Sequence, residues 1–116
     1  MRVLVCGGRD YSDAAMVNGI LDGINRSTPI AVLIQGGAAG ADCLAREWCG
    51  AHEVPYDNYA ADWKAHGRAA GPMRNQRMID DGNPDLVVAF PGGRGTADMV
   101  RRARKAGLTI IAVEKS

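Results

Sequence analysis

The sequence predicts a single Rossmann-like, doubly wound α/β domain, with a parallel sheet of about five strands and helices on both faces. Short apolar runs alternate with helix-like segments along all 116 residues. Four of these runs are continuously apolar, which is typical of strands covered by helices on both faces. No linker, low-complexity tract or charge run divides the chain, so one domain is expected over residues 1–116.

The elements follow in order along the chain. Strands are predicted at 2–6, 30–35, 54–59, 85–90 and 108–114. The third strand is the weakest, because its proline and polar residues suit an edge or a strand entrance. Helices are predicted at 12–25, 40–51, 72–81 and 95–107, with a polar loop and a short helical turn at 60–71. Pro72 suits the first position of its helix, and Gly107 suits the end of the last one.

Composition excludes several classes of protein. The chain is 47% hydrophobic and 23% charged, an ordinary globular mixture, and its net charge of +1 provides no basic field for nucleic acid. It contains no signal peptide and no apolar run of about 18 residues, so neither export nor membrane insertion is expected. We therefore expect a cytoplasmic protein.

Cysteines and histidines do not suggest a metal or redox site. The three cysteines, Cys6, Cys43 and Cys49, lack CxxC spacing, and buried reduced thiols are expected. A catalytic thiol is disfavoured because neither His52 nor His66 is placed beside one by the sequence. The histidines also lack the paired spacing of a metal site, so no metal and no cofactor are expected.

Glycine clusters follow three of the predicted strands. They are "VCGGRD", "IQGGAAGAD" and "FPGGRGTAD". A tight turn explains any one cluster equally well, but the carboxyl ends of parallel strands share one edge, where such sheets bind ligands. Glycine lets backbone N–H groups approach an anion, and the following helix adds the positive end of its dipole. The three clusters together favour a phosphate-bearing ligand, and neither GxGxxG nor GxxxxGK[ST] is present.

The candidate ligand-binding residues lie in these loops and in the segment 60–77. Arg74 is expected near a helix start, where its planar guanidinium suits phosphate. Trp63 suits either a base platform or a cap on the core, and Asp62 either the ligand or the surface. Asp42 and Asp98 suit either a helix dipole or ribose hydroxyls. The full set is Gly7, Gly8, Arg9, Asp10, Gly36, Gly37, Asp42, Asp62, Trp63, Arg74, Asn75, Pro91, Gly92, Gly93, Arg94, Gly95, Thr96 and Asp98.

Five ordered motifs, "GGRDY", "GGAAGAD", "ADW", "AAGPMRNQRM" and "FPGGRGTAD", resemble the YspA-like branch of the SLOG superfamily. Relatives there include the Lonely Guy (LOG) phosphoribohydrolases and the DNA-processing protein DprA. The resemblance extends from Val3 to Val113 and implies a nucleotide-binding domain. Because LOG relatives are commonly dimers, it also implies a homodimer or a higher homo-oligomer.

LOG enzymes release a base from a nucleoside 5′-monophosphate, and their motif is PGGxGTxxE. Pro91, Gly92, Gly93, Gly95 and Thr96 match it, but the glutamate falls on Met99, which cannot ionise. The catalytic arginine of that family corresponds to Arg74. A carboxylate normally stabilises the oxocarbenium character of the transition state or activates water. Asp98 points about 100° away from Met99 around an ideal helix, so using Asp98 or Asp42 instead requires a rearranged site.

The sequence is therefore consistent with three functions. The first is binding of a nucleotide or nucleotide-derived signal, which we prefer. The second is LOG-like hydrolysis of a nucleoside monophosphate, with Asp98, Asp42 and Arg74 as the catalytic residues. The third is DprA-like binding of single-stranded DNA, which the charge balance makes the least favoured.

Overall fold

The sequence-predicted architecture is confirmed by a computed structural model, which describes residues 1–114. Five parallel strands form one sheet in the order β3-β2-β1-β4-β5. The strands are β1 (Arg2–Cys6), β2 (Val32–Gln35), β3 (Tyr56–Asn58), β4 (Leu86–Ala89) and β5 (Thr109–Ala112). Each lies within a predicted strand and is shorter by up to three residues, except β1, which matches residue for residue.

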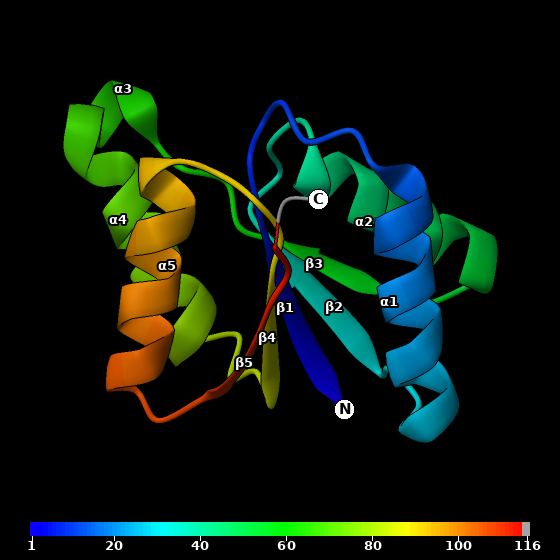
Figure 1. Ribbon diagram of the computed structural model, residues 1–116. Coiled ribbons are helices and arrows are strands. Elements are labelled where there is room, and N and C mark those ends of the chain that lie inside the picture. The colour runs from blue at the N-terminus through cyan, green and yellow to red at the C-terminus, as the bar shows by residue number, and fades with distance from the viewer. Residues whose placement is uncertain (115–116) are drawn as a thin grey trace.

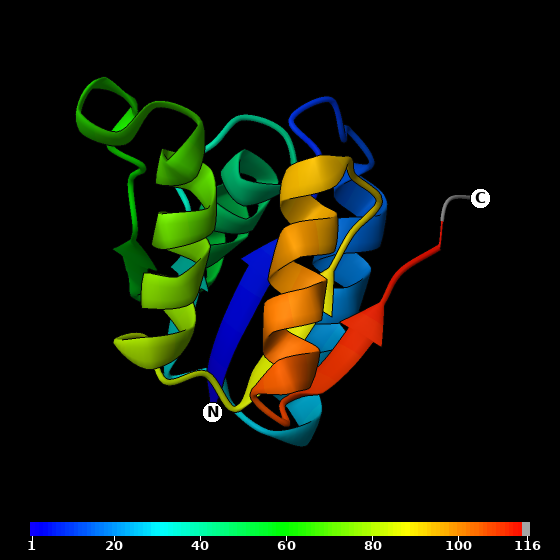
Figure 2. The ribbon, with the colours of Figure 1, turned by 90° about the vertical axis from the view of Figure 1, so that its left-hand side faces the viewer.

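The helices cover the sheet from both sides, as Figures 1 and 2 show. They are α1 (Ala14–Ser27), α2 (Ala41–His52), α3 (Trp63–His66), α4 (Ala70–Asp80) and α5 (Arg94–Lys105), with a 3₁₀ turn, η1 (Gly67–Ala69), between α3 and α4. The helices α1 and α2 lie on one face, and α4 and α5 lie on the other (Figure 1). In the described residues no helix is long and apolar enough to cross a membrane.

Alternate residues of the central strands build two cores, one under each pair of helices. Val3, Val5 and Leu33 pack with α1 and α2, whereas Leu4 and Ile34 pack with α4 and α5. All five of these side chains are fully buried. The continuous apolar runs in β1 and β2 therefore reflect burial on both faces, as expected.

Three expectations about local structure were wrong. The helix predicted to start at Pro72 starts at Ala70, because η1 leads directly into α4. Pro72 is the third helical residue, where a missing N–H still costs no intrahelical bond. The last strand is not buried on both faces, since β5 lies at the edge of the sheet and leaves Ile111 37% exposed. Cys43 is only partly buried, unlike Cys6 and Cys49.

Candidate functional site

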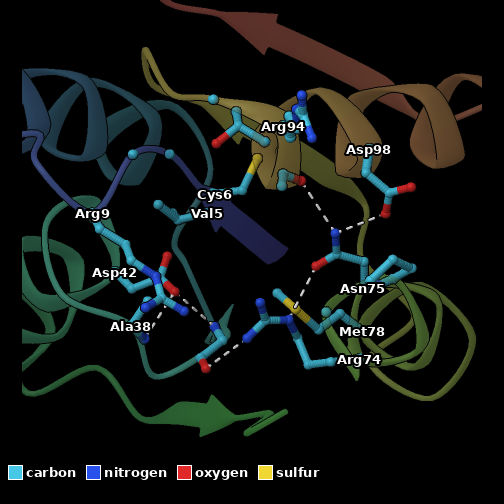
Figure 3. A pocket seen from close by; sticks show the side chains of 18 of the residues that line it. Val5, Cys6, Arg9, Ala38, Asp42, Arg74, Asn75, Met78, Arg94 and Asp98 are labelled. Atoms are coloured by element: carbon cyan, nitrogen blue, oxygen red, sulfur yellow. Dashed lines mark hydrogen bonds between the residues drawn. The ribbon is translucent and has the colours of Figure 1, made fainter. Parts of the chain in front are cut away.

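A cavity of about 460 Å³ opens at the carboxyl edge of the sheet, between the loops after β1 and β2 and the start of α5 (Figure 3). The segment from α3 to α4 forms its remaining wall. Thirteen of the sequence-predicted residues line the cavity. They are Gly7, Gly8, Arg9, Gly36, Asp42, Trp63, Arg74, Asn75, Gly93, Arg94, Gly95, Thr96 and Asp98.

The loops after β1 and β2 are held together by a close backbone approach. Gly8 O accepts hydrogen bonds from Ala41 N, at 3.1 Å, and from Tyr11 N, at 3.2 Å. Gly40 has a φ of +71°, and a Cβ there would lie 2.1 Å from Gly8 O. Glycine at position 40 is thus required by the fold itself, because both the positive φ and the contact exclude a side chain.

The start of α5, unlike the tightly packed contact between Gly8 and Gly40, is open to the cavity. Its N-cap, Gly93, provides no side-chain hydrogen bond. Within residues 1–114, the backbone N–H groups of Arg94, Gly95 and Thr96 have no hydrogen-bond partner. A Cβ added at Gly93 or Gly95 would meet no atom within 4 Å. This helix end therefore presents unpaired donors and open space to the cavity, which is the arrangement that suits an anion.

Arg74 lies across the cavity from α5 and is fixed by its neighbours (Figure 3). Its Nη1 donates to Gly36 O at 2.9 Å, and its Nε donates to Asn75 Oδ1 at 3.1 Å. Burial lowers the pKa of Arg74 from its ordinary value, and Asp42 partly opposes the effect. The side chain still carries its charge at neutral pH, in a geometry prepared before any ligand arrives.

Asp42 and Asp98 both line the cavity, but only one keeps a carboxylate oxygen available. Asp42 Oδ2 accepts hydrogen bonds from Gly36 N, at 3.1 Å, and Ala38 N, at 3.2 Å, while Oδ1 has no partner among the described residues. Burial raises the pKa of Asp42, and the two backbone N–H groups partly counteract it. Asp42 thus shapes the loop with one oxygen and offers the other to the cavity.

Asp98 is committed to a network between helices. Its Oδ2 accepts from Asn75 Nδ2, at 2.9 Å, and from Arg102 Nε, at 2.8 Å. Its Oδ1 accepts from Arg101. Burial alone raises the pKa of Asp98, but the hydrogen bonds from Arg102 and Asn75 outweigh it and lower the pKa from 3.8. The two aspartates of the similar "AD" sequences therefore have different hydrogen-bond partners, because Asp42 is the second residue of α2 and Asp98 is the fifth residue of α5.

Trp63 and Arg9 stand together at the rim of the cavity. Trp63 is 50% exposed, so it does not cap the core. The Arg9 guanidinium carbon lies 5.9 Å from the ring centroid, within the range of a cation–π contact. An indole face at the entrance of a cavity is suited to stacking on a planar group.

The floor of the cavity is apolar and contains no reactive thiol. Cys6 and Met78 line it from β1 and α4. Burial, reinforced by the negative charge of Asp42, raises the pKa of Cys6 to about 12. Met99 does not face the cavity and instead packs in the core below it, with only 1% exposure. The position matched to the LOG glutamate therefore belongs to the core.

Five predicted residues lie outside this cavity. Asp10, Pro91 and Gly92 line a neighbouring cavity on the other side of the β1 loop. Asp62 caps α3 by accepting a hydrogen bond of 3.1 Å from Ala65 N. Gly37 has a φ of +76°, and a Cβ there would lie 2.6 Å from the Asn58 side chain. Local structure thus accounts for Asp62 and Gly37.

Sequence reasoning missed part of the lining. Arg68 is an exposed residue that also lines the cavity, where it joins three other arginines, Arg9, Arg74 and Arg94. No sequence pattern marks Arg68, because its position depends on how η1 folds over the edge of the sheet. The other missed lining residues are Val5, Cys6, Ala38, Gly71, Pro72 and Met78.

Comparison with solved structures supports the fold. The DNA processing protein A (DprA) of Streptococcus pneumoniae superposes with a TM-score of 0.79 at 20% identity, over 99% of this chain and 50% of that chain. The chain thus spans half the length of that DprA chain. The protein TM1055 superposes with a TM-score of 0.70 at 20% identity, over 94% of this chain and 71% of that chain.

Sequence comparison identifies the family. The Gene 61 protein of Mycobacterium phage D29 is 39% identical over 119 residues, covering 95% of this chain and 94% of that protein. The model of the YspA, cpYpsA-related SLOG family matches residues 1–66, which contain β1 to β3 and the first two glycine loops. The chain belongs to the YspA, cpYpsA-related SLOG family.

Proposed function

We propose that this protein binds a nucleotide or a nucleotide-derived signalling ligand, with a phosphate at the start of α5. The observation that carries the proposal is the group of unpaired backbone donors at Arg94, Gly95 and Thr96, beside two glycines with open space. A side chain at position 95 would meet no atom within 4 Å, so packing does not require glycine there, although glycine in a helix costs about 0.5–1 kcal/mol relative to alanine. Close approach of a ligand explains why glycine stands there.

Charge supports a phosphate at this place. Four arginines line the cavity, against two carboxylates. Asp98 is already paired with Arg101 and Arg102, so its charge is largely compensated. Arg94 lies at the start of α5, where the helix dipole also favours an anion, and Arg9, Arg68 and Arg74 line the other walls of the same cavity.

Residues on the other walls of the cavity suit the ribose and the base of the nucleotide. The unengaged oxygen of Asp42 is suited to accept a hydrogen bond from a ribose hydroxyl. The exposed ring of Trp63 is suited to stack on the base, with Arg9 alongside. In this arrangement the polar contacts come from the start of α5 and from Asp42, and the apolar side chains of Cys6 and Met78 lie beneath the sugar.

Titration calorimetry with a panel of nucleoside monophosphates, cyclic nucleotides and dinucleotides tests the proposal. Tryptophan emission gives a second readout, because Trp63 is exposed and Trp48 is 2% exposed. We expect saturable binding of at least one phosphate-bearing compound and no binding of the matching nucleoside. Equal binding of nucleoside and nucleotide, or no binding at all, contradicts a phosphate site at α5.

Hydrolysis of a nucleoside 5′-monophosphate is a second candidate, and Asp42 is the observation that favours it. Its free oxygen and raised pKa suit proton transfer, whereas both oxygens of Asp98 are engaged. Chromatography that detects free base and ribose 5-phosphate tests for turnover. If turnover occurs, Asp42→Asn should abolish it while the asparagine oxygen still accepts the bonds from Gly36 N and Ala38 N.

A further inference from the structure

A second cavity, of about 620 Å³, adjoins the first at the carboxyl edge of the sheet. It is lined by the segment from Asp10 to Asp13, by Met16, by the loop after β4 and by Glu114. Gly8, Arg9 and Gly93 line both cavities, so they form a saddle between them. Each cavity falls within the range of about 300–1,000 Å³ that is typical of small-molecule sites.

The saddle lies where the order of the strands reverses. From β1 the chain moves outward through β2 to β3, and it then returns to β4 on the opposite side of β1. The loops after β1 and β4 meet there, and Gly8 N donates to Pro91 O at 2.9 Å. The first cavity extends towards α4 and α5, and the second towards α1 on the other face. Ligands of open α/β sheets bind in this crevice, and in dinucleotide-binding folds a ligand with two halves lies across it.

The two cavities differ in charge. The first holds four arginines, whereas the second holds Asp10, Asp13 and Glu114, with Arg9 of the saddle as its only lysine or arginine. Asp13 uses one oxygen to cap α1, and Asp10 makes no side-chain hydrogen bond within residues 1–114. Carboxylates accept hydrogen bonds from hydroxyl groups and repel phosphate. The second cavity therefore suits an uncharged group rich in hydroxyls.

We propose that the ligand is a nucleoside diphosphate whose terminal phosphate carries a second, hydroxyl-rich group such as a sugar. The inference rests on the proposed phosphate site at α5. The nucleoside lies in the first cavity, the diphosphate crosses the saddle beside Arg9 and Gly93, and the second group meets Asp10 and Glu114. The residues that line both cavities are two glycines and Arg9, so no core side chain stands among the shared lining residues.

Titration calorimetry on the full chain tests this inference with matched pairs of probes. The pairs are ADP with ADP-ribose, UDP with UDP-glucose, and GDP with GDP-mannose. The test variant is Asp10→Asn combined with Glu114→Gln, which removes two charges from the second cavity and spares the α1 cap. A second variant, Ser12→Trp, fills the second cavity without changing its charge.

We expect at least one sugar-bearing probe to bind about tenfold or more tightly than its parent diphosphate, a gain of about 1.4 kcal/mol. Both variants should remove that gain and change binding of the parent diphosphate by less than about threefold. Equal affinity within every pair, or a gain that survives both variants, overturns the two-cavity ligand while leaving the α5 phosphate site in place. Failure of every diphosphate and every monophosphate to bind overturns the phosphate site as well.

Discussion

Asn75 of α4 joins Arg74 to Asp98 of α5 through a single amide group. Its Oδ1 accepts from Arg74 Nε, at 3.1 Å, and its Nδ2 donates to Asp98 Oδ2, at 2.9 Å, and to Gly95 O, at 3.2 Å. Asn75 is 5% exposed, so water cannot easily replace these bonds. The residue thus holds the guanidinium of the cavity and the first turn of α5 in one arrangement (Figure 3).

Replacing Asn75 by alanine should therefore destabilise the protein and weaken ligand binding together. The change leaves Arg74 Nε without this partner and removes one donor from buried Asp98 Oδ2, and an unsatisfied buried group costs about 1–3 kcal/mol. Urea denaturation and calorimetry with the binding nucleotide measure the two effects. Gln76→Ala, on the same helix but bonded to Asp80 and Arg102, is the control and should leave affinity unchanged. Unaltered stability in Asn75→Ala contradicts the bridging role.

Replacing Asp98 by asparagine should reduce the loss of stability in acid. The pKa of Asp98 is lowered below 3.8 in the folded state, so folding favours its ionised form. The resulting stability is present above pH 3.8 and is lost as the pH falls below that value. The free energy of unfolding, measured in urea at about pH 7 and about pH 3, should thus change less in Asp98→Asn than in the wild type.

Asp42 should give the opposite dependence on pH. Its pKa is raised above 3.8 by burial, so its ionised form opposes folding above the folded-state pKa. Protonation removes that penalty as the pH falls towards 3.8. Asp42→Asn should accordingly show no gain in acid resistance in the same urea experiment. Asp81→Asn, on the surface, is the control for both carboxylates. Identical pH profiles for the Asp98 and Asp42 variants would falsify these assignments.

Replacing Gly95 by alanine should separate ligand binding from stability. The added methyl group meets no protein atom, so stability should stay the same or rise by about 0.5–1 kcal/mol. Affinity for the nucleotide should fall about tenfold or more because the methyl group occupies the space beside the phosphate. Gly19→Ala, in an equally open place on α1, is the matched control for stability and should leave affinity unchanged.

Replacing Gly40 by alanine should instead disrupt the fold. Alanine is strained at a φ of +71°, and its Cβ would lie 2.1 Å from Gly8 O. Strain of this kind costs about 1–3 kcal/mol at one residue, before the clash is added. Thermal unfolding measures the loss. Gly50→Ala within α2, the helix that Gly40 caps, should not show it because the new Cβ meets no atom within 4 Å. A stable Gly40→Ala variant means that the two loops can separate.

The cysteines should differ in reactivity towards a maleimide. Burial, with a further contribution from Asp42, raises the pKa of Cys6 to about 12. Burial also raises the pKa of Cys49, to about 11. Because the thiolate is the reactive form, partly exposed Cys43 should be labelled first in the native protein at about pH 8. Peptide mapping by mass spectrometry identifies the labelled residue. Early labelling of Cys6 would contradict the burial of its thiol at the bottom of the cavity.

The parallel sheet and the meeting of the glycine loops were predictable because both depend on local pattern. Continuous apolar runs in β1, β2 and β4 are what double burial requires, and parallel strands bring their carboxyl ends to one edge. The exposure of β5 was not predictable from its own residues, since "LTIIAVE" is as apolar as the inner strands. Only its place at the edge of the sheet leaves Ile111 partly exposed.

The candidate site divides in the same way. The positions of Gly93, Gly95 and Arg74 at the carboxyl edge follow from the order of strands, loops and helices, which the sequence specifies through its periodicity. Tertiary structure determines the different hydrogen-bond partners of Asp42 and Asp98. It also determines that Arg68 lines the cavity. The physical reason is that the role of a charged side chain depends on its hydrogen-bond partners and its burial, and segments distant in the sequence supply both.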